Sequence, residues 1–191
     1  MSEERGGPGF FGSSVVPVRL VFLMWLSFTI EFLYGYDLSF LGIFPRTLSG
    51  LVGVFTAPMI HGSLTHLISN TIPLLFLGTA LFFFYERIGR VVFFRCYFLT
   101  NLLVWMLSPR ESIHIGASGL VYGLSAFLIF FGLFRKDFVS LLISVVFMLM
   151  YGGIFYGVLP LDSRVSWESH LAGALVGAFT AFNLRNTKQV A

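Results

Sequence analysis

The stretch Gly116-Ala-Ser118-Gly119 opens directly into an apolar run that extends from Leu120 to Phe134. Its serine stands at the start of a predicted helix, whose first backbone N–H groups have no intrahelical partner and can hold an anion. A serine hydroxyl beside such donors is typical of an acyl-transfer site. Because Gly and Ser are also common packing residues in membrane helices, the stretch indicates catalysis only if the chain supplies a base as well.

The composition is that of a membrane protein with several spans. Of the 191 residues, 57% are hydrophobic and only 11% are charged, whereas a soluble domain has about 25% charged residues. The lipid bilayer is therefore the expected surrounding, and no basic run with interleaved aromatic residues suggests a nucleic-acid partner. The single cysteine, Cys96, excludes an intrachain disulfide and a metal site built from several cysteines.

Six apolar stretches approach the roughly 20 residues that a helix needs to cross a bilayer. The longest connection between them, Asp37 to Gly62, is broken by Pro45 and Pro58, so we expect it to lie in the membrane interface or to form a short re-entrant helix. We predict a disordered tail over residues 1–14, one transmembrane domain over 15–185 and a C-terminal tail over 186–191. The predicted spans are Leu20–Tyr36, Ser63–Phe84, Val91–Leu107, Ser118–Phe134, Phe138–Tyr156 and Ser169–Leu184.

The distribution of Lys and Arg predicts the orientation in the membrane. If the N-terminus is cytoplasmic, only Arg46, Arg110 and Arg164 of the 12 basic residues fall on the outer side. This bias predicts that both termini are cytoplasmic, which requires an even number of spans and fits six. The short ends and the lack of an organelle-targeting sequence favour a bacterial plasma membrane. The basic residues assigned to the inner side are Arg5, Arg19, Arg87, Arg90, Arg95, Arg135, Lys136, Arg185 and Lys188.

Polar residues of three predicted spans fall at one depth. His66 and Asn70 are four residues apart near the start of the second span, so they share one helix face. Ser118 opens the fourth span and His170 opens the sixth. All three spans run from outside to inside in the predicted topology, which places these groups in the outer half of the membrane. Because polar groups are costly there, their convergence predicts a functional site.

The chemistry that these residues predict is acyl transfer by a Ser–His dyad. His170 would accept the proton of Ser118 and later pass it to the leaving amine. No acidic residue is placed to orient the imidazole, whereas Tyr122, one turn after Ser118, could stack on it. His66, Asn70 and the Ser118 backbone N–H would surround the oxyanion.

Small residues are expected to bring these groups together. Gly116 would let the backbone approach the oxyanion closely. Gly173 and Gly177 form a GxxxG pair, which permits the sixth span to pack closely on the fourth. His61 is interpreted as a structural hydrogen-bonding residue at a helix start, with the shaping of a water cavity as the alternative role.

Together these motifs resemble the rhomboid family of intramembrane serine proteases. The resemblance implies a six-transmembrane-helix, all-α bundle with a water-filled cavity open to the outer side and with Gly119 as part of the serine motif. It also implies that single-pass transmembrane proteins are cleaved near the outer membrane face without a cofactor or a metal. The matching patterns are His61-x-x-x-x-His66-x-x-x-Asn70, Gly116-Ala-Ser118-Gly119 with Tyr122, and His170-x-x-Gly173-x-x-x-Gly177.

Two other functions stay open at this point. One is a catalytically silent rhomboid-like protein that binds membrane clients. The other is a metal transporter or metalloenzyme that uses His61, His66 and His170. The spacing disfavours the metal site, because His61 and His66 diverge on a helix and no carboxylate joins them.

Two loops are expected to set this chain apart in detail. Many members of the family carry a Trp-Arg pair in the first long loop, where Val52 and Gly53 stand here, so a different anchor is expected for that loop. The fifth span and the loop from Gly157 to Glu168 are the expected gate for substrates.

Overall fold

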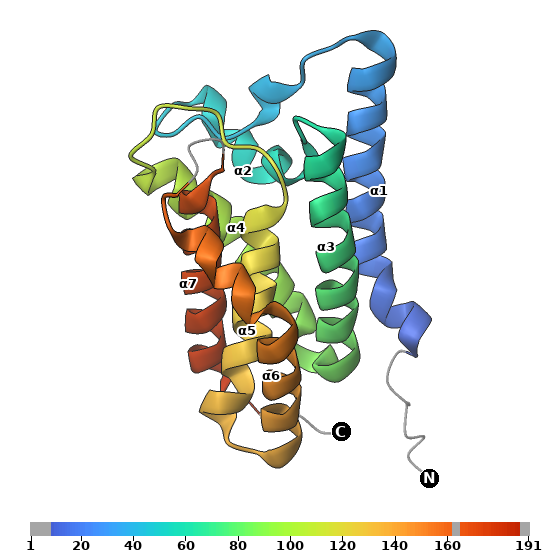
Figure 1. Cartoon of the computed structure of the whole chain (residues 1–191), viewed down its shortest axis with the longest axis vertical. Coiled ribbons are helices and arrows are strands. Elements are labelled where there is room, and N and C mark those ends of the chain that lie inside the picture. Colours follow the sequence, from blue (N-terminus) through green and yellow to red (C-terminus); the bar gives the residue numbers. More distant parts are fainter. Residues whose placement is uncertain (1–8, 162–164, 188–191) are drawn as a thin grey trace.

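The computed structural model describes residues 9–161 and 165–187 (Figure 1). In this part of the chain all elements of regular secondary structure are helices, joined by loops. Five of them are long and apolar enough to cross a membrane. The sixth long helix, α7, does not reach the same hydropathy, because Glu168 and His170 occupy its first turn. The five are α1 (Phe10–Tyr34), α3 (Leu64–Phe84), α4 (Glu86–Leu107), α5 (Ser118–Arg135) and α6 (Phe138–Tyr151) with its 3-10 extension η4 (Gly152–Val158); α7 spans Trp167–Leu184.

Helix α5 is the centre of the bundle. It contacts α3, α4, α6 and α7, and it has the largest buried share of the five apolar helices. The residues of α5 are apolar on every face of the helix, which is the pattern of a helix enclosed by others. Its fully buried side chains include Leu124, Phe127, Leu128, Ile129 and Phe131.

Helix α1 packs on α3 at the edge of the bundle (Figure 1). Gly78 of α3 makes room for the Pro17 ring, since a Cβ at Gly78 would lie 2.7 Å from the Pro17 Cβ. The Trp25 indole N–H donates to the Thr71 hydroxyl at 3.1 Å, so the two helices also share a polar contact. Most of the outer face of α1 stays exposed and apolar, as expected of a surface that faces lipid.

The long connection between α1 and α3 folds into four short helices and packs against α4. These are η1 (Ser39–Leu41), η2 (Ser49–Leu51), α2 (Gly53–Thr56) and η3 (Ala57–Met59). Side chains of α4 donate to its carbonyls: Tyr97 to Phe55 at 2.6 Å, Asn101 to Val54 at 3.1 Å and Trp105 to Thr47 at 2.8 Å. These bonds anchor the loop and give a structural role to Asn101, which the sequence alone left without one.

Helix boundaries differ from the predicted spans mainly at N-terminal ends. Helix α1 begins at Phe10, ten residues before the predicted Leu20, and it includes Pro17. Residues 10–14, which composition places in a tail, are therefore helical, while residues 1–8 lie outside the described part. Helix α4 begins at Glu86, directly after Tyr85 and five residues before the predicted Val91, and its first residues include the charged Glu86, Arg87 and Arg90. Charge at the end of a helix is compatible with helical backbone, which accounts for the late predicted start of α4, whereas the polar, glycine-rich composition of the N-terminal residues led to the late predicted start of α1.

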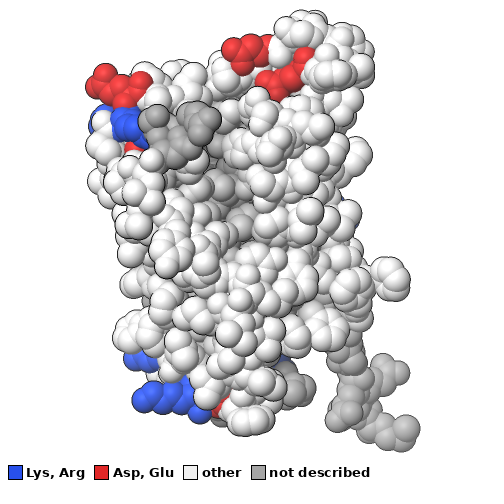
Figure 2. Space-filling model, viewed as in Figure 1, with Lys and Arg blue, Asp and Glu red and all other residues white. Residues whose placement is uncertain are grey.

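Charged residues gather at the two ends of the bundle. Figure 2 shows Lys and Arg mainly at the lower end, where α5 turns into α6, and Asp and Glu mainly at the upper end. The walls between them carry large exposed apolar side chains, such as Phe76, Phe94, Leu142 and Phe179. An apolar belt with charged ends is what a bilayer requires, and this is an integral membrane protein.

Candidate active site

Ser118 is the first residue of α5 and follows a sharp turn. Gly116 has φ = 103°, in the left-handed region that glycine tolerates best, and its N–H donates to the Ala57 carbonyl at 2.9 Å. Ala117, at the N-cap, offers no side-chain cap to the helix. The first N–H groups of α5 consequently lack intrahelical partners beside a half-buried serine hydroxyl.

His170 lies in the first turn of α7, with its imidazole held on two sides. Its Nδ1 is 2.9 Å from the Gly157 carbonyl oxygen, and its ring stacks on Tyr122 with centroids 4.0 Å apart and planes at 7°. A carbonyl can only accept, so Nδ1 carries the proton and Nε2 of the neutral ring is free to act as a base. A backbone carbonyl thus occupies the place that an aspartate fills in a triad.

Ser118 and His170 line the same cavity of about 310 Å³. No hydrogen bond joins them in the described part of the chain, and such catalytic contacts often tighten only when substrate binds. The walls combine a few polar groups with an apolar surface, as ligand sites generally do. The other lining residues are His66, Ser69, Asn70, Pro73, Ile115, Val121, Tyr122, Ile154, Val165 and Ser166.

His66 and Asn70 reach this cavity from the first turns of α3. The Ser63 hydroxyl caps that helix by accepting from the His66 N–H at 3.1 Å. The Asn70 amide donates to the His66 carbonyl at 2.9 Å and carries a second N–H. The His66 ring lies against Gly116, where a Cβ would come within 2.6 Å of it. Gly116 is therefore needed for its dihedral angle and also for the space that His66 fills.

His61 is buried behind His66, outside the cavity lining. Its Nε2 accepts a long hydrogen bond from the Ala117 N–H at 3.4 Å, and its ring meets the His66 ring edge-on with centroids 4.9 Å apart. Burial and the neighbouring His66 lower the pKa of His61 to about 4, so it is neutral at neutral pH and can accept. His61 therefore braces the turn that presents Ser118.

Glycines allow α7 to pack directly on the backbone of α5. A Cβ at Gly173 would lie 2.0 Å from the Gly119 carbonyl oxygen, and one at Gly177 would lie 2.0 Å from that of Gly123. Real Cβ atoms do not approach so closely, so each of these positions must be glycine at this helix separation. Gly119 in turn faces Thr100 of α4, whose methyl would be 2.9 Å from a Cβ there.

Sequence motifs did not reveal every residue that shapes the site. Gly157 is one: a Cβ there would lie 1.8 Å from the Tyr122 hydroxyl and 3.3 Å from His170 Nδ1. Ser166 is another. It is the N-cap residue of α7 and makes no side-chain capping hydrogen bond to that helix, yet it lines the cavity. Neither residue belongs to a sequence motif. The sequence singled out only the loop from Gly157 to Glu168 as a whole, as the expected gate.

Comparisons with known proteins agree with this arrangement. The family described as Rhomboid domain matches residues 49–187. The chain belongs to the rhomboid family. The match contains all the segments that line the cavity, from α3 to α7.

Several bacterial proteins are similar over most of this rhomboid chain. An uncharacterized protein of Mycobacterium tuberculosis is 38% identical over 177 residues, which cover 87% of this chain and 73% of that protein. An uncharacterized protein of Mycobacterium leprae is 33% identical over 172 residues, 85% of this chain and 67% of that protein. A Bacillus subtilis protein named "Putative rhomboid protease YdcA" is 26% identical over 136 residues, 68% of this chain and 65% of that protein.

The alternative function, a metal site, has no matching set of ligands among the described residues. Over 9–161 and 165–187, no three or more His, Cys, Asp or Glu side chains form a group suited to a metal ion. His66 and His170 line the cavity while His61 stays behind it.

Proposed function

We propose that this rhomboid is an intramembrane serine endopeptidase that uses Ser118 and His170 to cleave single-pass transmembrane proteins near the outer membrane face. One observation carries the proposal: the Gly157 carbonyl fixes the His170 tautomer, so that Nε2 is free as a base in the cavity that Ser118 lines. A catalytically silent client-binding protein has no need of a histidine held in this state. The stacked Tyr122 ring adds a second constraint on the same imidazole.

The proposed reaction begins when Ser118 Oγ attacks the scissile carbonyl carbon and its proton passes to His170 Nε2. Negative charge then develops on the carbonyl oxygen. His66, the Asn70 amide and the first N–H groups of α5 are the donors available to stabilise it. His170 gives the proton to the leaving amine, and the ester left on Ser118 is hydrolysed by water with the same histidine as base.

In the proposed topology α7 is the sixth span and both termini are cytoplasmic. Contact with α4 and α5 shields the polar turns of α7 from lipid, which lets a helix of modest hydropathy cross the membrane. The basic lower end of the bundle in Figure 2 would then face the cytoplasm, in keeping with the positive-inside tendency. Bacterial relatives support a plasma-membrane location, and the cavity would open toward the outer side.

The deciding experiment pairs two measurements on purified protein in liposomes, made on wild type and on Ser118→Ala. One is cleavage of a single-pass reporter, and the other is covalent labelling by a fluorophosphonate probe. Wild type should do both, and Ser118→Ala should lose at least about 10⁴-fold in each while it unfolds at the same temperature. Labelling without cleavage would mean an active enzyme that lacks its substrate. A wild type that does neither would favour the silent client-binding protein.

A further inference from the structure

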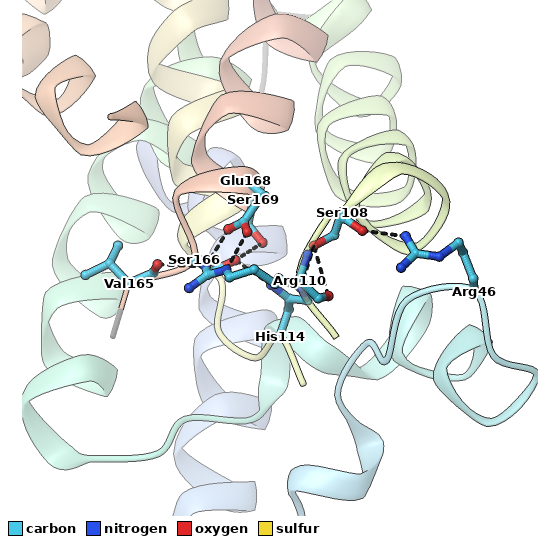
Figure 3. A network of polar contacts seen from close by, with 8 residues as sticks. All are labelled: Arg46, Ser108, Arg110, His114, Val165, Ser166, Glu168 and Ser169. Atoms are coloured by element: carbon cyan, nitrogen blue, oxygen red, sulfur yellow. Dashed lines mark hydrogen bonds and ion pairs between the residues drawn. The ribbon is translucent and has the colours of Figure 1, made fainter. Parts of the chain in front are cut away.

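A polar cluster beside the cavity, which shares Val165 and Ser166 with the cavity lining, joins the loop before α5 to the first turn of α7 (Figure 3). Its centre is Arg110, whose guanidinium binds both carboxylate oxygens of Glu168 through Nε and Nη2. The same Nη2 donates to the Val165 carbonyl at 2.9 Å. A planar guanidinium that grips a carboxylate in this bidentate way fixes its direction as well as its distance. Arg110 thus holds the chain just before α7 and within its first turn.

His114 makes a second connection between the same two segments. Its Nδ1 lies 2.6 Å from the Ser166 hydroxyl and its Nε2 lies 3.0 Å from the Ser108 hydroxyl. The Ser166 hydroxyl is in turn 2.7 Å from that of Ser169. His114 is buried, and burial lowers its pKa although Glu168 opposes the shift, so one ring nitrogen donates and the other accepts. We call Arg110, His114, Ser166 and Glu168 the α7 clamp.

The α7 clamp acts where the glycine contacts with α5 do not reach. Gly173 and Gly177 fix the middle of α7, whereas His170 lies in its first turn, where helices fray most easily. Glu168 is only 6% exposed, so its carboxylate depends on Arg110 for compensation. Without that cation a buried charge would stay unpaired, and the first turn would move toward water to relieve it.

We propose that Arg110, supported by His114, is a positioning residue that fixes the first turn of α7 and so sets His170 in the cavity it shares with Ser118. The proposal rests on the proposed function, because it assigns a purpose to the location of His170. Arg110 does not line the cavity, so it acts on the reaction through the residues that it holds, Val165 and Glu168.

The test measures the rate of Ser118 labelling by a fluorophosphonate probe, with the unfolding temperature recorded in the same liposomes. Arg110→Gln should slow labelling by about 10- to 100-fold, because a small misplacement of a catalytic group has effects of that size. Arg110→Lys keeps the positive charge but lacks the two parallel N–H donors of a guanidinium. It should therefore recover part of the labelling rate that Arg110→Gln loses. Should Arg110→Gln fail to fold, Arg110→Lys alone decides: a reduced rate supports the proposal, and a wild-type rate overturns it.

Arg46 offers a matched control from the other side of the same segment. Its guanidinium donates to the Ser108 carbonyl and, among the described residues, makes no hydrogen bond to α7 (Figure 3). Arg46→Gln should therefore label within about twofold of wild type, a change below 0.5 kcal/mol at 1.4 kcal/mol per tenfold. If Arg46→Gln slows labelling as much as Arg110→Gln, the effect belongs to the loop and the proposal is wrong. A wild-type rate in Arg110→Gln would refute it as well.

A second readout separates this proposal from the proposed function. In a Cys96→Ala background, Ser118→Cys and His170→Cys would be joined by a short bifunctional thiol reagent, which needs no catalysis. Arg110→Gln should slow this cross-linking several-fold. Slower cross-linking with a wild type that never labels Ser118 would keep the α7 clamp and reject the protease. Labelling by wild type with unchanged cross-linking in Arg110→Gln would keep the protease and reject the clamp.

Discussion

Helices α7 and α6 both pack on α5, but they are attached in different ways. Along α7, Gly173 and Gly177 rest directly on the carbonyls of α5, and the α7 clamp contacts its N-terminal end. Helix α6 is tied to α5 over its first half: a Cβ at Gly132 of α5 would lie 1.9 Å from the Ser140 carbonyl oxygen, and the Ser144 hydroxyl donates to the Leu128 carbonyl and accepts from the Gly132 N–H, each at 3.0 Å. Helix α7, which carries the proposed base His170, is therefore held both in its first turn and in its middle.

The far end of α6 is held by looser contacts. It reaches α3 through rings: Phe76 lies 5.7 Å from Phe147 and 6.0 Å from Tyr151, centroid to centroid. Its extension η4 touches the site through the Gly157 carbonyl on His170. Such a difference would suit the proposed protease, whose Ser118–His170 dyad would have to stay in place while a substrate passes between helices. It also means that movement of η4 would disturb the orientation of the His170 ring.

The largest effect is expected where α7 lies on α5. Gly173→Ala places a Cβ 2.0 Å from the Gly119 carbonyl oxygen, so the helices must separate. We expect a loss of about 3 kcal/mol or more in the free energy of unfolding, with no detectable labelling of Ser118. Thermal unfolding followed by circular dichroism measures the first, and the fluorophosphonate probe measures the second. An unfolding temperature within a degree of wild type would show that α7 is not fixed in this way.

The next effect separates two glycines of η4 that lie four residues apart. Gly157→Ala would drive a Cβ to within 1.8 Å of the Tyr122 hydroxyl and push the carbonyl away from His170, whereas nothing lies within 4 Å of a Cβ at Gly153. We expect Gly157→Ala to slow Ser118 labelling by about 100-fold, as a misplaced base would. Gly153→Ala should leave the rate of Ser118 labelling unchanged. Equal rates in the two variants would remove the Gly157 carbonyl from the mechanism.

The smallest effect tests whether the far end of α6 moves. Phe76→Cys with Phe147→Cys allows a short reagent to tie α3 to α6. We expect reporter cleavage to fall by about tenfold, on the scale of a gated step, while labelling by the small probe stays within twofold. Each single-cysteine variant treated with the same reagent is the control. Full cleavage after complete cross-linking would exclude α6 as the gate for substrates.

Much of this protein could be predicted from its sequence because the signals are local or carried by spacing. Apolar length predicted the six long helices, five of which are long and apolar enough to cross a membrane, and α3 and α5 begin within one residue of their predicted starts. Helical spacing placed His66 and Asn70 on one face, and both line the cavity with Ser118 and His170. Their catalytic roles stay predictions until Ser118→Ala is measured.

Tertiary structure alone decided how the His170 ring is held and where the loops are anchored. The Gly157 carbonyl and the Arg110–Glu168 ion pair join residues far apart in the chain, so no local pattern contains them. Tyr97, Asn101 and Trp105 hold a loop some 40 to 60 residues away through its backbone, which has no side-chain signature. Sequence spacing fixes which groups share a helix face, whereas packing between helices fixes which of those faces meet.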